Sequence, residues 1–169
     1  MKVIVNAGHT KAGSKGSGAV GYLVESNETR AVSKELIKLL NEKGYTVIDA
    51  TVDTAFSQSD YLKKAVSIAN SKNGDLFLSI HFNAGGGKGV EAYTWRGEQV
   101  KEAVSICKGL NKLGFRNRGV KDGSGMYVIK KTKMKAVLLE VCFVDTKSDV
   151  DLYKKLGAKK IAEAIAASI

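Results

Sequence analysis

The sequence predicts one α/β domain, in which a twisted, mostly parallel or mixed sheet of about six strands carries helices on both faces. Three observations predict this class. The length of 169 residues suits a single domain, and strand-like and helix-like patterns alternate along the chain. With 44% hydrophobic and 26% charged residues, the chain can bury a core of its own. We therefore treat residues 1–169 as one unit without linker or repeat.

The first half of the chain predicts three strands separated by two helices. A β-branched run ends at Gly8, and a glycine-rich loop follows it. Ser26 carries a helix-start signature, and apolar residues then recur with helical spacing until Gly44. The predicted elements are strand 2–7, a helix from 26 to 44, strand 45–50, a helix ending near 73, and strand 76–80, whose continuous apolar run indicates burial on both faces.

The second half predicts two more strands and three helices. An alternating pattern marks strand 89–95, helical spacing covers 100–113, and a continuous apolar run interrupted by one acid marks strand 136–144. Two helices, starting at Lys147 and at Gly157, complete the chain.

The charge of the chain is strongly positive. Lys and Arg number 27 against 17 Asp and Glu, a net charge of +10. Nine of the basic residues lie between Lys108 and Lys135 with only Asp122 opposing them, which gives this stretch +8. Such a segment suits an anionic partner such as a wall polymer, nucleic acid or lipid, or it is a solvated face that keeps the protein soluble.

The two cysteines and the chain start limit the cellular setting. Cys107 and Cys142 belong to no metal-spaced pair and no disulfide framework, so we expect both thiols to stay reduced. The chain reaches Gly8 and His9 before an apolar segment long enough for a signal peptide forms. No stretch is apolar enough to span a membrane. We expect a monomer made in the cytoplasm, without a signal peptide or membrane insertion.

The two histidines both fall at predicted strand ends. His9 follows the first strand, and His81 ends the third. In open α/β sheets, ligands bind outside the carboxyl ends of the strands, so the two rings are expected to converge there. Each ring taken alone also fits a hydrogen-bonded polar residue at a strand end.

Two acids complete the candidate site. Glu25 stands just before the first predicted helix, where an acid is also favoured by the helix dipole alone. Glu140 interrupts an apolar strand, and ionising a buried carboxyl group is costly unless it is compensated. Such acids often carry protons, although a paired structural acid is the competing interpretation.

Together, His9, Glu25 and His81 supply two imidazoles and one carboxylate. This set suits a tetrahedral zinc ion that keeps an open position for water. The sequence has no H-E-x-x-H motif, so the ligands would have to come from three separate elements.

At these residues the chain resembles the zinc-dependent N-acetylmuramoyl-L-alanine amidases, the peptidoglycan-cleaving domain of phage endolysins and bacterial autolysins. The resemblance covers the whole chain and is anchored at residues 3–9, Glu25, 79–84 and 138–144. It implies that His9, Glu25 and His81 hold zinc and that Glu140 is the catalytic acid/base. One departure is Lys135, where a proline is expected.

The resemblance also implies the setting. A peptidoglycan hydrolase without a signal peptide would act on the wall after release from the cell, as an endolysin does, and the basic stretch from Lys108 to Lys135 would contact anionic wall polymer. Two alternatives stay open: a zinc peptidase acting on peptidoglycan cross-links, and a non-catalytic basic module that binds wall polymer or nucleic acid. Because no nucleic-acid module fits the chain, we do not expect nucleic acid as the partner.

The glycines of residues 16–21 match the G-x-G-x-x-G pattern of dinucleotide sites, but they lie well inside a long loop. The tight turn between strand and helix that a pyrophosphate requires is therefore missing, and no dinucleotide cofactor is expected.

Overall fold

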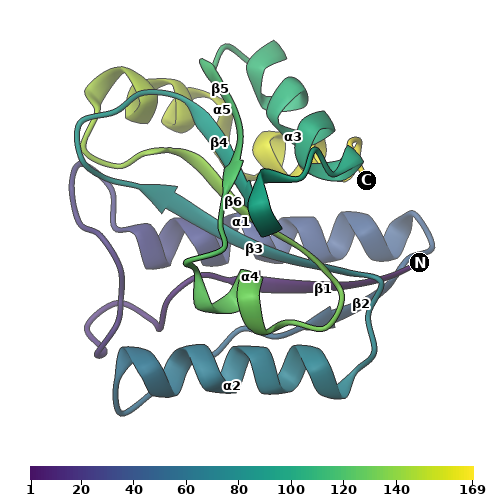
Figure 1. Ribbon diagram of the computed structural model, residues 1–169. Helices are drawn as coiled ribbons and strands as arrows, with labels where there is room; N and C mark the ends of the chain where they lie inside the picture. Colours follow the sequence, from purple (N-terminus) through teal and green to yellow (C-terminus); the bar gives the residue numbers. More distant parts are fainter.

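The computed structural model describes residues 1–169 as one α/β body with a six-stranded mixed sheet (Figure 1). The elements are, in chain order, β1 (Lys2–Ala7), α1 (Glu25–Glu42), β2 (Thr46–Asp49), α2 (Gln58–Ser71), β3 (Leu76–Asn83), β4 (Val90–Thr94), a 3-10 turn (Trp95–Gly97), α3 (Lys101–Lys112), β5 (Asn117–Asp122), α4 (Tyr127–Lys131), β6 (Lys135–Phe143) and α5 (Lys147–Ala166).

The strands lie in the order β2-β1-β3-β6-β4-β5. Four of the neighbouring pairs are parallel, and β4 runs antiparallel to β6. As a result, β1, β3 and β6 bring their carboxyl ends to one edge of the sheet. The amino ends of β4 and β5 reach the same edge.

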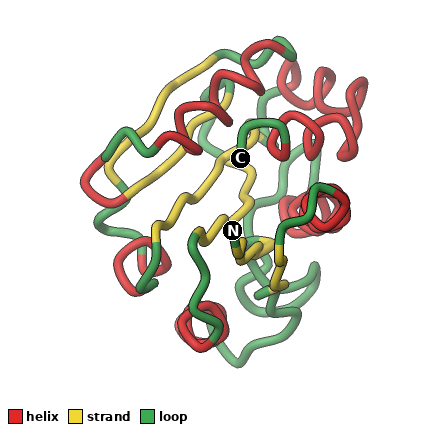
Figure 2. The backbone as a smooth tube through the Cα atoms, turned by 90° about the vertical axis from the view of Figure 1, so that its right-hand side faces the viewer, coloured by secondary structure: helices red, strands yellow, loops and turns green.

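Helices cover both faces of the sheet, as Figure 2 shows from the side. On one face, α1, α3 and α5 pack over the larger core, which includes Val3, Leu78, Leu139 and Ile106. On the other face, α2 and the short α4 cover a smaller core around Phe77. On this second face, residues of α2 and α4 line a cavity together with His81 and Glu140 of the sheet. The predicted fold class is therefore confirmed.

Most predicted elements are confirmed within a few residues, with one change at the start of α1. The helix begins at Glu25, and Val24 precedes it without a side-chain cap. Ser26 is fully buried, and its hydroxyl has no hydrogen-bond partner, so it is not the cap that its sequence context predicts. Glu25 is thus the first residue of the helix and does not end the preceding loop.

The predicted break at Gly157 is present as a kink within α5. The backbone of Gly157, at φ 76°, departs there from the helical conformation. Two elements, β5 and α4, were not predicted from the sequence. β5 is an edge strand, paired only with β4, and it carries charged residues and a glycine in place of an apolar alternation. α4 has five residues, too few to display helical periodicity.

Both cysteines, Cys107 and Cys142, are buried and unpaired. Burial raises the pKa of the Cys107 thiol to about 11, which disfavours the reactive thiolate. None of the helices combines the length and the apolar character needed to cross a bilayer.

Candidate metal centre and active site

The topology brings the four candidate residues to one edge of the sheet. β1 and β3 are parallel neighbours, so His9, two residues past the end of β1, lies beside His81 near the end of β3. His81 is the register partner of Glu140 on β6. Glu25, at the amino end of α1, completes the group.

Three of these residues converge on one point. The His9 Nε2 and His81 Nδ1 atoms both lie 3.1 Å from the same Glu25 oxygen, Oε1. One ligand atom from each residue falls within 4.8 Å of the other two. The two imidazole rings meet edge to face, with centroids 4.9 Å apart. Glu140 lies beside this cluster and is not part of it.

Glycines allow the rings to approach this closely. A Cβ atom at Gly8 would overlap the His81 ring, and one at Gly18 would overlap both Glu25 and His9. His9 itself adopts φ 67°, in the left-handed region that residues other than glycine rarely occupy. Strained backbone of this kind persists where surrounding contacts hold it, and it is common at functional sites.

The outer nitrogen of each ring has a hydrogen-bond partner in the protein. His9 Nδ1 lies 3.0 Å from the carbonyl oxygen of Gly16, which can only accept, so this nitrogen carries the proton. The Ser79 hydroxyl donates to Asn6 Oδ1, which leaves its oxygen to accept from His81 Nε2. The hydrogen-bond partners therefore place the proton of each ring on its outer nitrogen. The inner nitrogens, His9 Nε2 and His81 Nδ1, are left with free lone pairs.

The charges of the cluster favour a cation at its centre. Burial raises the pKa of Glu25, but its interactions with His81 and His9 outweigh that effect and hold the pKa well below the usual range. Burial lowers the pKa of His81. With the protons of both rings on their outer nitrogens, the two inner nitrogens and the Glu25 carboxylate oxygen face one another as three ligand atoms. This donor set fits Zn²⁺.

Glu140 lies on the wall of a cavity of about 400 Å³ that His9 and His81 also line. Tyr61 and Tyr127 also line this cavity. One oxygen of Glu140, Oε2, is enclosed and has no hydrogen-bond partner. Burial, followed by the nearby charges of Glu25 and Glu91, raises the pKa of Glu140 well above its usual value. A carboxyl group of this kind suits proton transfer.

Comparison with known proteins gives the family. A family model described as N-acetylmuramoyl-L-alanine amidase matches residues 3–169. The chain belongs to this amidase family. The amidase LytC of Bacillus subtilis is 34% identical over 174 residues, which cover 96% of this chain and 34% of LytC.

Solved structures agree with this assignment. The catalytic domain of an endolysin targeting Clostridia difficile superposes on the amidase domain with a TM-score of 0.91 and 29% identity, covering 99% of this chain and 96% of that one. An uncharacterised protein of Clostridium perfringens is 40% identical over the whole chain, which spans 51% of that relative's length. The amidase domain therefore spans about half the length of such a relative.

Two residues of the amidase domain that support the histidines, Tyr61 and Ser79, were not predicted from the sequence. The Tyr61 hydroxyl accepts from the backbone N–H of His9 at 2.8 Å and donates to Asn6 Oδ1. Ser79 is the register partner of Asn6 and lies two residues before His81, on the same face of β3. This two-residue spacing is a signal that could have identified Ser79. Tyr61 comes from α2 and carries no such signal.

Proposed function

We propose that this domain hydrolyses the amide that joins the lactyl group of N-acetylmuramic acid to L-alanine of the stem peptide. His9, Glu25 and His81 would hold one Zn²⁺, and Glu140 would be the catalytic acid/base. When bound, zinc would supply a Lewis acid that polarises the scissile carbonyl and lowers the pKa of water. The observation that carries this proposal is the convergence of three ligand atoms on one point, beside a buried carboxyl group in the same cavity.

The chain's own residues then have separate tasks. Ser79 and the carbonyl group of Gly16 fix the tautomers of His81 and His9 through their outer nitrogens. Glu140 takes a proton from the attacking water and passes it to the nitrogen of the leaving amine. The hydroxyl of the water ends on the lactyl carbonyl carbon, and L-alanine leaves with a free amino group.

The raised pKa of Glu140 suits both halves of that task. A carboxylate of ordinary pKa is a weak base toward water and a poor donor to an amine at neutral pH, because it is almost fully ionised. A higher pKa brings the two protonation states closer in population, which favours accepting a proton and then releasing it.

The proposed substrate is the bacterial wall, and the proposed setting is an endolysin that acts after release. In the folded protein, the basic residues between Lys108 and Lys135 fall into those paired with acids and those left exposed. Arg118 and Lys121 pair with Glu91, and Lys135 pairs with Glu102, so their charges are partly neutralised. Lys130, Lys131 and Lys133 are exposed and have no acidic partner. These three residues form the α4 lysine patch.

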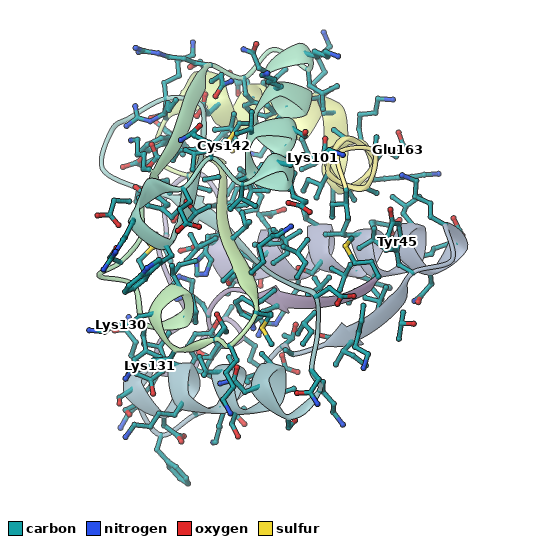
Figure 3. The ribbon with its side chains drawn as sticks, turned by 45° about the vertical axis from the view of Figure 1, so that its right-hand side comes forward. Tyr45, Lys101, Lys130, Lys131, Cys142 and Glu163 are labelled. Carbon is teal, nitrogen blue, oxygen red and sulfur yellow. The ribbon has the colours of Figure 1, made fainter.

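Figure 3 shows Lys130 and Lys131 on α4, away from Lys101 and Glu163 on α3 and α5. The α4 lysine patch therefore lies on the same face of the sheet as the site, since α4 packs against α2 and its Tyr127 lines the cavity. We propose that it contacts anionic wall polymer and retains the domain on its substrate by electrostatic attraction.

Product analysis tests the proposed reaction. Purified cell walls are incubated with the zinc-loaded domain, and the released material is examined by mass spectrometry and by labelling of new amino groups. The proposal requires new N-terminal L-alanine together with intact lactyl carboxyl ends on the glycan. New amino groups on another residue would instead indicate a peptidase acting on the cross-links. Sedimentation with walls without any new amino group would indicate a binding module.

A further inference from the structure

Beyond the proposed zinc ligands and Glu140, the face of the sheet that carries Glu140 has a second buried carboxylate. Glu91, on β4, is only 2% exposed. Its Oε1 accepts from the side chains of Asn83 and Tyr93, each at 2.8 Å. Its Oε2 accepts from Arg118 and Lys121, both on β5. Four donors therefore hold this one carboxylate.

This cluster is continuous with the active site. Glu91 is the register partner of Glu140 on β6, so the two side chains project from the same face of the sheet. Asn83, which links the cluster to β3, lies two residues after His81, past an irregularity in the pairing of β3 with β6. Because neighbouring strands are about 4.8 Å apart, β5 places Arg118 about 10 Å from Glu140. Figure 1 shows β6, β4 and β5 side by side.

The cluster holds one more positive charge than Glu91 can neutralise. Arg118 and Lys121 both contact the same carboxylate oxygen. Their side chains keep 28% and 36% of their surface exposed. Two cations on one acid leave a net charge of +1 at the surface, next to the cavity.

The guanidinium group of Arg118 keeps its two terminal nitrogens free to bind a ligand. Only Nε bonds to Glu91, and the guanidinium group lies over the ring of Phe143, with its central carbon 5.2 Å from the ring centroid. The two terminal nitrogens make no hydrogen bond to the protein. Parallel N–H groups on a fixed guanidinium match the two oxygens of a carboxylate.

Stability alone does not account for this arrangement. Replacing a buried ion pair by apolar residues of similar volume is often neutral or stabilising. A carboxylate that is itself held by Asn83 and Tyr93 and that accepts one hydrogen bond from each of two cations, beside the candidate active site, instead pre-organises those cations for a ligand.

We infer that Arg118, supported by Lys121, forms a subsite for a carboxylate of the stem peptide on the amine side of the scissile amide. This inference rests on the proposed amidase function. An extended peptide spans about 3.3–3.6 Å per residue, so the second and third residues of the stem lie about 7–10 Å from the scissile bond. A carboxylate on either residue is within reach of Arg118. The subsite makes the enzyme selective for acidic over amidated stem peptides.

The test compares soluble muropeptides that differ only in this charge. N-acetylmuramoyl-L-alanyl-γ-D-glutamyl-L-lysinamide carries a free α-carboxylate on the second residue, and the same compound built with D-isoglutamine carries an amide there and no free carboxylate on its peptide. A third substrate has the amide on the second residue and a free carboxylate on the third. The zinc-loaded wild type should cleave at least one acidic substrate about tenfold or more better in kcat/KM than the fully amidated one, mainly through KM. Which acidic substrate is preferred identifies the residue that binds.

Variants of Arg118 connect this preference to the subsite. Arg118→Gln should bring the ratio of acid to amide kcat/KM close to one, and Arg118→Lys should restore part of it. Arg116→Gln is the matched control, because Arg116 is exposed, lies two residues earlier and makes no side-chain hydrogen bond or ion pair. This control should keep the wild-type ratio.

Equal cleavage of all three substrates by the wild type would overturn the subsite while leaving the amidase function intact, and this arm needs no variant to fold. Retention of the acid preference in folded Arg118→Gln would also overturn it. Absence of cleavage of every substrate, with zinc bound, would overturn the amidase function and the subsite together.

Discussion

Glu91 and Glu140 lie directly opposite each other on the antiparallel strands β4 and β6. Their pKa values move in opposite directions. Burial raises the pKa of Glu91, but hydrogen bonds from Lys121 and Arg118 outweigh it and hold the pKa below its usual value. Glu140 lacks such donors, and burial raises its pKa. Neighbouring carboxyl groups whose pKa values diverge take different roles, and Glu140 is the one suited to move a proton.

Removal of the Glu91 carboxylate should destabilise the fold. Glu91→Ala leaves Arg118 and Lys121 without their acid, and we expect the free energy of unfolding to fall by about 2 kcal/mol. This is less than the roughly 3–5 kcal/mol typical of a fully buried pair, because both cations keep contact with solvent. Urea denaturation measures the change. Glu98→Ala, at an exposed acid without an ion pair, is the control and should change stability little.

The same variant predicts a pH dependence. A carboxyl group with a lowered pKa stabilises the folded state above its unfolded pKa, and the contribution is lost as the pH falls through the folded value. The stability difference between wild type and Glu91→Ala should therefore be full at pH 7 and shrink below about pH 4. A difference that grows toward acid pH would contradict the assignment of Glu91 as an ionised partner.

The metal assignment predicts about one zinc per chain, measured by elemental analysis of the purified protein, since one set of three ligands is present. Strong chelation should abolish activity, and added zinc should restore it. His9→Ala and His81→Ala should each lower the zinc content strongly. Normal zinc content in both variants would refute the ligand assignment.

Ser79 should raise the zinc affinity of the proposed site without contacting the metal, because it holds the His81 ring in place. Ser79→Ala removes the acceptor that holds His81 Nε2, and loss of such a partner typically lowers metal affinity about 10- to 100-fold. A competition titration against a chelator measures the change. Ser71→Ala, at an exposed serine near the end of α2, is the control. Unchanged affinity in Ser79→Ala would mean that another contact orients the ring.

The α4 lysine patch predicts a difference between walls and soluble substrates. Reversal of charge at Lys130, Lys131 and Lys133 should weaken sedimentation with walls and slow their turnover, and the wild type should lose the same binding in high salt. Cleavage of a small muropeptide should be spared. Reversal at Lys154, Lys155 and Lys159, which are exposed on α5, is the control of equal charge. Equal losses on both substrates would mean that the patch shapes the site itself.

The parts of the fold that follow from local pattern were predictable. β3 is a continuous apolar run, and α1 keeps helical spacing, so both were found from the sequence. β5 was missed because an edge strand needs no apolar alternation, and its charged residues predicted only a basic surface. The sequence likewise carries no indication that Arg118 and Lys121 on β5 converge on Glu91, because that contact depends on the parallel pairing of β5 with β4.

At the candidate site, too, residues marked by a local pattern were predictable, and residues that act through contacts between layers were not. His9 and His81 were brought together by the rule that parallel strands end at one edge, and Glu140 was singled out as an acid in an apolar strand. Tyr61 was not predicted, because it lies on α2, which packs on one face of the sheet, and its hydroxyl contacts the backbone of His9 from there. Contacts between layers depend on packing that a sequence pattern does not encode.

The most direct test of the proposed mechanism is the Glu140→Gln variant, measured for zinc content and for amidase rate in the same preparation. Gln keeps the size of the side chain and removes the base, so the rate should fall by about a hundredfold to ten-thousandfold while zinc content stays near one per chain. The free energy of unfolding should hold or rise, because the enclosed Oε2 of a carboxylate is replaced by a neutral amide. Loss of zinc together with activity would make Glu140 a ligand, and full activity would show that another group moves the proton.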